Sequence, residues 1–169
     1  MGLSVSRGRC RAEIPETQTV HCLVLPWHLR RTTSEDCLFV ASHRYPDVLS
    51  SDDAVRHYAD WVADAMKREV YLGWLAEVEG EVIAGLGITL LEWGPTRMDP
   101  QPLRARVVNV FTQLAYRGNG ISSQLLQEAL REVQRRGIRT LSLGTTDQAR
   151  ALYGRYGFQP YAAEMIRRG

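Results

Sequence analysis

The chain has 169 residues, 44% of them hydrophobic and 24% charged, which is enough apolar material for one globular domain and too much for a disordered chain. Its net charge of +2 is too small to predict binding to nucleic acid or to a membrane surface. Cys10, Cys22 and Cys37 are too scattered for a disulfide framework or a zinc site and indicate a reducing cytoplasm, and no apolar run is long enough to span a bilayer.

The N-terminal part is expected to begin as a loose tail and then enter the domain. Residues 1–18 are polar, rich in arginine and without periodicity, which predicts a tail before one domain over residues 19–169. The run VHCLVL at 20–25 has the composition of a strand, and a proline ends it. A short helix is predicted over 37–44, because two acidic residues just before it suit a first turn and Tyr45-Pro46 would break it.

A second helix and a pair of strands are predicted next. The run SDD at 51–53 can open the helix, and its apolar residues recur at helical spacing: Val55, Tyr58, Ala59, Val62, Ala65 and Met66. Residues 70–78 and 81–91 then have the pattern of two strands joined by a tight turn. Gly85 and Gly87 lie inside the second strand and indicate either a bulge or a place where a ligand or backbone comes close.

A proline-rich loop at 92–102 leads into residues 107–133, the segment around which the chain is organised. This segment combines an apolar β-favouring run, a glycine-rich turn and an amphipathic helix. A short strand at 141–143, a helix at 147–156 and a final strand or hairpin at 158–166 are expected to follow. Helices alternating with strands in this order predict an α/β fold, in which one mixed sheet has central strands buried on both faces.

The turn from Arg117 to Gly120 suggests a site for a phosphate or pyrophosphate. It lies where the first N–H groups of a helix lack intrahelical partners and the helix dipole adds positive charge. Glycines let the backbone approach an anion closely, and Arg117 adds a donor fork suited to phosphate oxygens. Short glycine motifs are about as frequent in turns that only reverse the chain, and the usual triphosphate and dinucleotide motifs are both missing. The turn alone leaves both interpretations open.

Two motifs in this order resemble landmarks of the GNAT superfamily of acyl-CoA-dependent N-acetyltransferases. The run RGNGIS at 117–122 is similar to the family's Arg/Gln-x-x-Gly-x-Gly/Ala loop, with Ser122 where Gly or Ala is usual. The run ALYGRYGF at 151–158 looks like the family's segment around a Leu-Tyr pair and a Gly-Phe pair. The resemblance implies a single GNAT-like domain with a mixed, mostly antiparallel sheet, a splayed cofactor slot, helices on both faces, and a first strand at 28–33 in place of 20–25.

The resemblance also implies acetyl-CoA as co-substrate, without a metal. Backbone amides of the loop would hold its diphosphate, at Arg117, Gly118, Asn119, Gly120, Ile121 and Ser122. The preceding strand would bond the pantetheine arm through its main chain, at Val110, Phe111 and Thr112. The N–H near Val110 is also the candidate for polarising the thioester carbonyl. Thr146 stands where the family often has an Asn that contacts the coenzyme.

Tyr153 is the candidate catalytic acid, because it matches the family's tyrosine and a phenol can protonate a leaving thiolate. The alternative for an aromatic beside Leu152 is a place in the core. The candidate bases are Glu77 and Glu92, in or after strands that usually wall the acceptor site, together with Asp147 and Glu164. An ordinary solvated carboxylate is the favoured explanation for any one of them, and the resemblance implies that a chain of waters can serve instead.

These patterns predict an N-acetyltransferase that moves an acetyl group from acetyl-CoA to a primary amine of a small molecule, by direct attack in a ternary complex. The alternatives are a protein N-terminal or lysine acetyltransferase, a non-catalytic acyl-CoA-binding module, and an α/β domain without a coenzyme. The expected partner is a small-molecule amine acceptor, with no nucleic acid and no membrane. A homodimer is the default if the chain self-associates, and the fold does not identify the acceptor.

Overall fold

The computed structural model describes residues 26–45, 49, 52–162, 165, 167 and 169, and within them the chain forms five strands, four α-helices and two short 3-10 helices. In chain order these elements are β1 (His28–Arg31), η1 (Ser34–Asp36), α1 (Cys37–Arg44), α2 (Asp53–Lys67), β2 (Tyr71–Val78), β3 (Glu81–Glu92), β4 (Leu103–Thr112), η2 (Leu114–Tyr116), α3 (Ile121–Arg135), β5 (Leu141–Leu143) and α4 (Asp147–Gly154).

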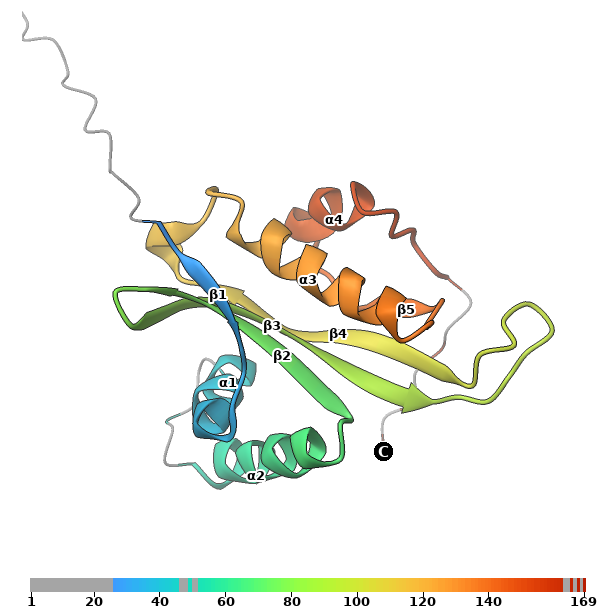
Figure 1. The fold of residues 1–169 in the computed structure, drawn as a ribbon, viewed down its shortest axis with the longest axis horizontal. Helices are drawn as coiled ribbons and strands as arrows, with labels where there is room; N and C mark the ends of the chain where they lie inside the picture. Colours follow the sequence, from blue (N-terminus) through green and yellow to red (C-terminus); the bar gives the residue numbers. More distant parts are fainter. Residues whose placement is uncertain (1–25, 46–48, 50–51, 163–164, 166, 168) are drawn as a thin grey trace, which may run out of the picture.

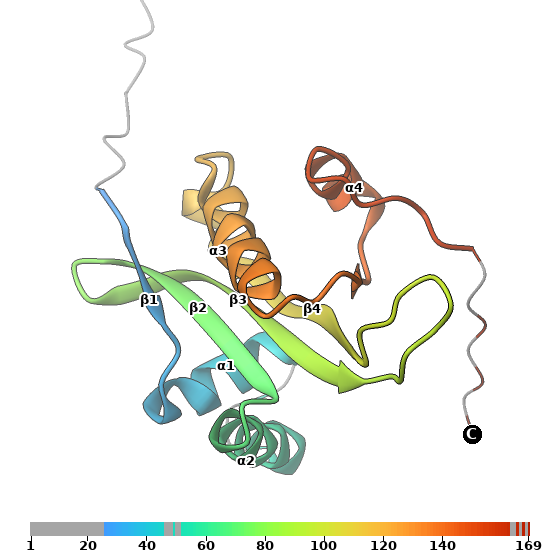
Figure 2. The same ribbon diagram turned by 45° about the vertical axis from the view of Figure 1, so that its right-hand side comes forward.

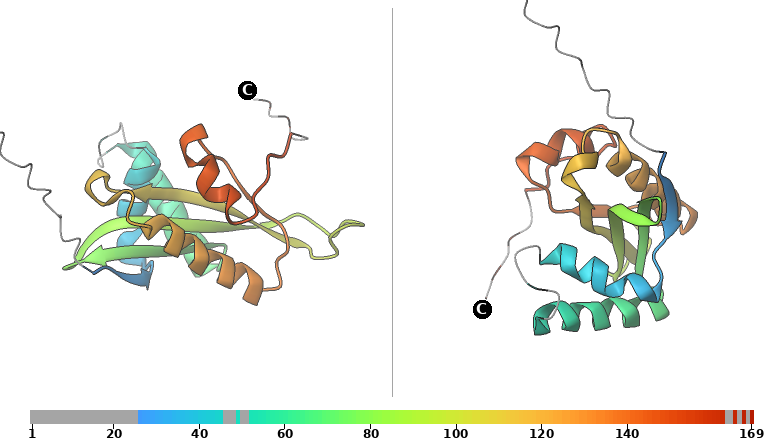
Figure 3. Two further views of the ribbon diagram at one scale, coloured as in Figure 1. Left: turned by 90° about the horizontal axis from the view of Figure 1, so that it is seen from above. Right: turned by 90° about the vertical axis from the view of Figure 1, so that its left-hand side faces the viewer.

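The strands form one mixed sheet in the order β1-β2-β3-β4-β5 (Figure 1). Neighbouring strands are antiparallel except β4 and β5, which are parallel. Helices α1 and α2 cover one face, and α3 and α4 lie on the other (Figure 2). An end-on view shows the same three layers, with the sheet between the two pairs of helices (Figure 3). The central strands β2 and β3 are therefore buried on both faces, as the alternating sequence pattern predicts.

Two hydrophobic cores, one on each face, hold these layers together. The apolar stripe of α3 packs against the sheet with almost no exposed surface, through Ile121, Leu125, Leu126, Ala129 and Val133. On the other face, α1 and the buried stripe of α2 pack together over Tyr71. The N-terminus of α2 is capped, because the Asp52 carboxylate accepts a hydrogen bond from the Ala54 N–H at 2.8 Å.

The helix at 37–44, the strand pair and its turn, the organising segment and the short strand at 141–143 are all confirmed. The first strand among the described residues is His28–Arg31, at the position implied by the family resemblance. The tail at 1–18, the strand at 20–25 and Glu164 lie outside the described residues.

The prediction of a strand or hairpin at 158–166 is wrong for the described residues of that segment, which adopt no strand. Phe158 instead turns back onto α4. Its N–H donates to the Tyr153 carbonyl at 3.2 Å, and its ring contacts the Tyr153 ring edge-on at 5.8 Å between centroids. A residue fixed in this way cannot extend a strand beside β5, and Pro160 follows it two positions later.

Strands β4 and β5 separate partway along β4, and this leaves the slot that the family resemblance implies. Their pairing stops at Val107 and Leu143. Just beyond, β4 bulges where it faces β3, and Asn109 has a φ of 51°. The Asn109 amide donates to the Tyr58 hydroxyl at 3.0 Å and the Tyr71 hydroxyl at 3.3 Å, so the bulge is fixed from the α2 side.

The two glycines of β3 explain how aromatic rings fit beside this bulge. A Cβ at Gly85 would lie 2.5 Å from the Phe111 ring, and a Cβ at Gly87 would lie 2.3 Å from the Tyr71 hydroxyl. The register of β3 against β4 also shifts between Gly85 and Gly87. Both a bulge and a close approach are therefore present, and the atoms that approach belong to side chains of the same domain.

Candidate active site

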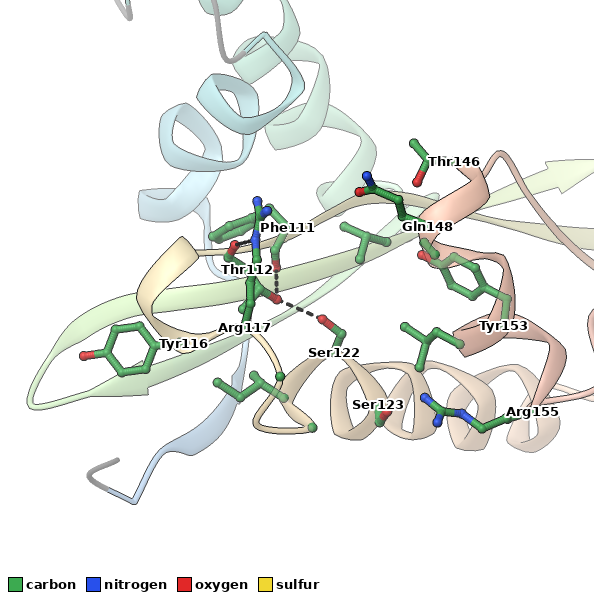
Figure 4. A pocket seen from close by; sticks show the side chains of 16 residues that line it. Phe111, Thr112, Tyr116, Arg117, Ser122, Ser123, Thr146, Gln148, Tyr153 and Arg155 are labelled. Carbon is green, nitrogen blue, oxygen red and sulfur yellow. Dashed lines mark hydrogen bonds between the residues drawn. The ribbon is translucent and has the colours of Figure 1, made fainter. Parts of the chain in front are cut away.

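A cavity of about 720 Å³ opens where β4 leaves β5, and we call it the coenzyme cavity. The end of β4, the turn after it, the first turn of α3 and one side of α4 form its walls (Figure 4). Most residues predicted to bind the coenzyme line it: Val110, Phe111, Thr112, Arg117, Gly118, Gly120, Ile121, Ser122, Thr146 and Tyr153. Asn119 does not, because its side-chain amide donates back to the carbonyls of Tyr116 and Arg117 and closes the turn.

The turn presents an open backbone surface to the cavity. Gly118 and Gly120 have φ values of 83° and 84°, which side chains other than glycine rarely adopt. No other atom lies within 4 Å of where a Cβ would stand at either position. Gly120 is the N-cap of α3 and no side chain caps this helix, so the first N–H groups of α3 remain available for an anion.

Two guanidinium groups give the coenzyme cavity a positive potential. Arg117 is held in place because its Nε donates to the Thr112 carbonyl at 3.1 Å. Arg155, at the C-terminal end of α4, reaches the cavity from the opposite wall (Figure 4). Within the described part of the chain, no aspartate or glutamate lines it. This charge and the free amides of α3 suit the phosphate groups of a coenzyme.

Ser122, the one departure from the glycine-loop pattern, uses its hydroxyl within the protein. The Thr112 hydroxyl donates to the Phe111 carbonyl at 2.9 Å, so the Ser122 hydroxyl donates to Thr112 Oγ1 across 2.8 Å. This bond joins the first turn of α3 to the end of β4. The serine therefore leaves the anion surface formed by the backbone open.

Tyr153 projects from α4 toward β4 across the coenzyme cavity (Figure 4). Its side chain is 6% exposed, and among the described residues no group hydrogen bonds its hydroxyl. Burial raises the pKa of the phenol, so the hydroxyl keeps its proton at neutral pH. Tyr156, by contrast, accepts a hydrogen bond from Gln127 and donates to the Ser123 carbonyl, both on α3.

The structure brings neither Glu77 nor Glu92, two of the four candidate bases, to this cavity. Asp147 is exposed at the start of α4 and does not line it either. Glu77 lies on β2, where its carboxylate forms an ion pair with Arg30 Nε at 2.6 Å and contacts His28 Nε2 at 3.0 Å. Glu92 pairs with Leu103 at the far end of β4. At about 3.4 Å per strand residue, this places it more than about 20 Å from Val110. These positions do not support either residue as a base that contacts the substrate.

Sequence reasoning missed several residues of the cavity wall. They are Tyr116, Ser123, Gln148, Ala149, Leu152 and Arg155. Gln148 and Leu152 of α4 and Arg155 directly after it are spaced four and three residues apart, so they lie on one face of the helix. That spacing is visible in the sequence, but which face meets the cavity depends on how α4 packs.

The described part of the chain contains neither a cluster of metal ligands nor a membrane-spanning helix. Within it, no three histidine, cysteine, aspartate or glutamate side chains gather as metal ligands would. Nor is any helix there both long and apolar enough to cross a bilayer.

Comparison with known proteins identifies the fold. The model of the acetyltransferase (GNAT) family matches residues 32–158. A crystal structure of a predicted acetyltransferase with acetyl-CoA from Clostridium acetobutylicum has a TM-score of 0.77 and 21% identity, over 85% of this chain and 96% of that one. A GCN5-related N-acetyltransferase from Ralstonia eutropha JMP134 has a TM-score of 0.74 and 27% identity, over 85% and 98%.

An aminoglycoside N-acetyltransferase in complex with CoA is also similar, with a TM-score of 0.67 and 13% identity over 85% of this chain and 95% of that one. No curated protein matched at a significant level. The family match spans most of the chain, and the coenzyme cavity has the free amides and cations that a diphosphate requires. The chain therefore belongs to the GNAT family of acetyl-CoA-dependent N-acetyltransferases.

Proposed function

We propose that the protein transfers the acetyl group of acetyl-CoA to a primary amine of a small molecule, by direct attack while both substrates are bound. The coenzyme cavity carries this proposal, because it joins an anion site at the start of α3 to a buried phenol on α4. Acetyl-CoA supplies the activated acyl group. The residues of the chain must hold it, polarise its carbonyl and manage the protons.

Holding the coenzyme falls to the turn and to the end of β4. The amides at the start of α3, with Arg117 and Arg155, would bind the diphosphate. The main chain at Val110, Phe111 and Thr112 would bond the pantetheine arm, and the Val110 N–H would polarise the thioester carbonyl. The bulge at Asn109 matters here, because it turns β4 away from β5 and exposes this stretch to the cavity.

Tyr153 would protonate the leaving thiolate. Its hydroxyl reaches the cavity, is free of hydrogen bonds from described residues and stays protonated because burial raises its pKa. The Tyr153 ring also packs against the Phe158 ring in an edge-to-face contact, which fixes the direction of the hydroxyl.

We assign removal of the amine proton to solvent. Among the described residues that line the coenzyme cavity there is no carboxylate or imidazole, and Glu77 and Glu92 lie away from it. An amine that loses its proton to water does so according to its own pKa. The pH dependence of kcat/KM for the acceptor should therefore follow the pKa of the amine supplied, and it should shift when an amine of different pKa is used.

A thiol-release assay with acetyl-CoA and a panel of small primary amines tests this function. Turnover on at least one small amine, with product mass raised by one acetyl group, is expected. Tight binding of acetyl-CoA without turnover on any amine or peptide would contradict catalysis and indicate a binding module. Peptides that outperform every small amine would contradict the substrate class.

A further inference from the structure

A second cavity meets the first at Tyr153. It has a volume of about 360 Å³, and we call it the arginine cavity after its polar lining: Arg106, Ser142, Thr145, Arg150 and Gln159. Phe158, Pro160 and Tyr161 form its apolar wall. Tyr153 lines both cavities, so the phenol stands between them.

The arginine cavity approaches the phenol from the other face of the sheet. Ala105 and Val107 of β4 are buried in the core beneath α3. Arg106 lies between them, and alternate side chains of a strand point to opposite faces, so Arg106 points to the face that α1 and α2 cover. Ser142 pairs with Arg106 in the sheet and faces the same way. A molecule in this cavity would meet the thioester across the gap between β4 and β5.

The charge of this cavity is positive. Arg106 is half-buried, and its polar contact among the described residues is a long one, from Nη1 to the Ser142 hydroxyl at 3.4 Å. None of the ion pairs between described residues includes it. Arg150 pairs with Asp147 at 2.9 Å, but both side chains are largely exposed, and such pairs are weak enough to be exchanged for a ligand. None of the lining residues that the structure describes is acidic.

A partly buried guanidinium without a counter-charge is unfavourable, and a carboxylate or phosphate that enters the cavity relieves this. The planar donor fork of arginine matches such groups in a bidentate manner. The hydroxyls of Ser142 and Thr145 and the amide of Gln159 add further donors.

We infer that the acceptor is a small primary amine that also carries an oxyanion, either a carboxylate or a phosphate, held by Arg106 and Arg150. This inference rests on the proposed function and narrows its substrate class. Polycationic acceptors such as aminoglycosides are disfavoured, because they would place positive charge against two arginines.

The test compares amines that differ only in the anionic group. One arm pairs each amino acid with its amide, and the other pairs glucosamine 6-phosphate with glucosamine; kanamycin represents polycations. Binding to the enzyme saturated with CoA is measured by calorimetry, so that no turnover is needed. We expect at least one anionic member to bind about 10-fold or more tightly than its neutral partner, and the arm in which it lies identifies carboxylate or phosphate.

Arg106→Gln should remove most of that preference and leave the neutral partner's affinity within about twofold, whereas Arg106→Lys should retain part of it. Arg150→Gln should act in the same direction. Arg56→Gln, which breaks an equally exposed pair with Asp53 on α2, is the matched control and should change nothing. Neutral amines or kanamycin binding as well as the anionic members, or no anionic member binding, would overturn the inference. Selective binding without acetyl transfer would instead contradict the proposed function alone.

Discussion

Tyr153 and Tyr156 lie three residues apart and have different tasks in the structure. Tyr153 faces both cavities, and Tyr156 hydrogen bonds to α3. Because general acid catalysis contributes roughly 10²–10⁴-fold, Tyr153→Phe should lower kcat by about 100-fold. The KM for acetyl-CoA should change little, since the ring still packs on Phe158. Steady-state thiol release measures both constants, and Tyr156→Phe is the control that should keep kcat within about twofold. A Tyr153→Phe enzyme with normal kcat would remove the proposed acid.

The pH dependence of kcat tests the role of the Tyr153 hydroxyl in a second way. Burial disfavours the charged phenolate and raises the pKa of Tyr153 above its ordinary value of 10.0. The phenol is therefore protonated at any pH below that value, and activity that depends on it is lost only above it. At saturating substrates, kcat should not decline between neutral pH and about pH 9. A decline centred near neutral pH would indicate a different acid.

Ser122 lies in the glycine loop, but its side chain has a structural role. Its hydroxyl donates to Thr112, so Ser122→Ala should lower the free energy of unfolding by about 1 kcal/mol. The backbone amides that face the anion remain, so the affinity for CoA should stay within about threefold. Urea unfolding and calorimetry measure the two effects separately. A large loss of CoA affinity with unchanged stability would place the hydroxyl on the coenzyme.

At the scale of elements, the bulge in β4 controls whether a slot exists. Asn109 has a φ of 51°, a region that asparagine tolerates and β-branched residues avoid. Asn109→Val should lower the free energy of unfolding by at least about 2 kcal/mol, through backbone strain and the lost bonds to Tyr58 and Tyr71. It should also weaken CoA binding, because a relaxed β4 would pair further along β5.

The matched variant for this position is Asn109→Gly. Glycine accepts the same backbone angle but lacks the amide, so its loss of stability reports the hydrogen bonds and the added freedom of the unfolded chain, without backbone strain. Urea unfolding of both variants gives the strain by difference. Equal stabilities for the valine and glycine variants would show that the bulge carries no strain.

An ion pair between Arg30 and Asp36 joins β1 to the start of α1. The Asp36 carboxylate accepts two hydrogen bonds from Arg30, at 2.7 and 2.8 Å, and these lower its pKa below the ordinary value of 3.8. A lowered folded pKa means that the stabilisation is present above the unfolded pKa and is lost as the pH falls through the folded value. Asp36→Asn should therefore destabilise the protein at neutral pH by about 1–3 kcal/mol.

The same substitution should flatten the loss of stability in acid. Below about pH 4 the carboxylate of the unfolded wild type takes up a proton, and the folded carboxylate does so only at a lower pH, so the difference between the two proteins should shrink as the pH falls below that value. Chemical unfolding at several pH values measures this. A difference that is constant from pH 7 to pH 3 would contradict the role of the charge, on the same linkage argument.

Most elements follow from local patterns in the sequence. The stripe of α3 and the glycines around it carry their own signals, so a helix at this place needed no tertiary information. The segment after α4 is harder to predict. Phe158 looks like the start of a strand in the sequence, but contacts with Tyr153 fix it against α4. The strand at His28–Arg31 is likewise held by its pairing with β2, which no local pattern reveals.

The sequence predicts the coenzyme loop well, but it does not predict which residues around α4 complete the cavity. Residues of the coenzyme loop lie together in the chain, and a motif finds them. Gln148 and Arg155 reach the same cavity only because α4 packs across it. Glu92 shows the opposite case, since the antiparallel pairing of β3 and β4 places it opposite Leu103 and far from the cavity.

At the scale of the whole molecule, positive charge is also divided between two cavities. Arg117 and Arg155 face the coenzyme cavity, and Arg106 and Arg150 face the arginine cavity, with Tyr153 between them. Coenzyme binding should therefore survive loss of the second pair. At a CoA concentration 100-fold above its dissociation constant, the folded state gains about 2.7 kcal/mol, which raises the melting temperature. Arg106→Gln should show the same shift as the wild type, whereas Arg117→Gln should show a smaller one.

A crystal structure of the complex with acetyl-CoA tests the central claim most directly. The diphosphate should lie on the N–H groups that begin α3, the pantetheine arm should run along Val110 to Thr112, and the sulfur should lie within hydrogen-bond reach of the Tyr153 hydroxyl. A coenzyme bound elsewhere, or a sulfur out of reach of that phenol, would contradict the proposed chemistry.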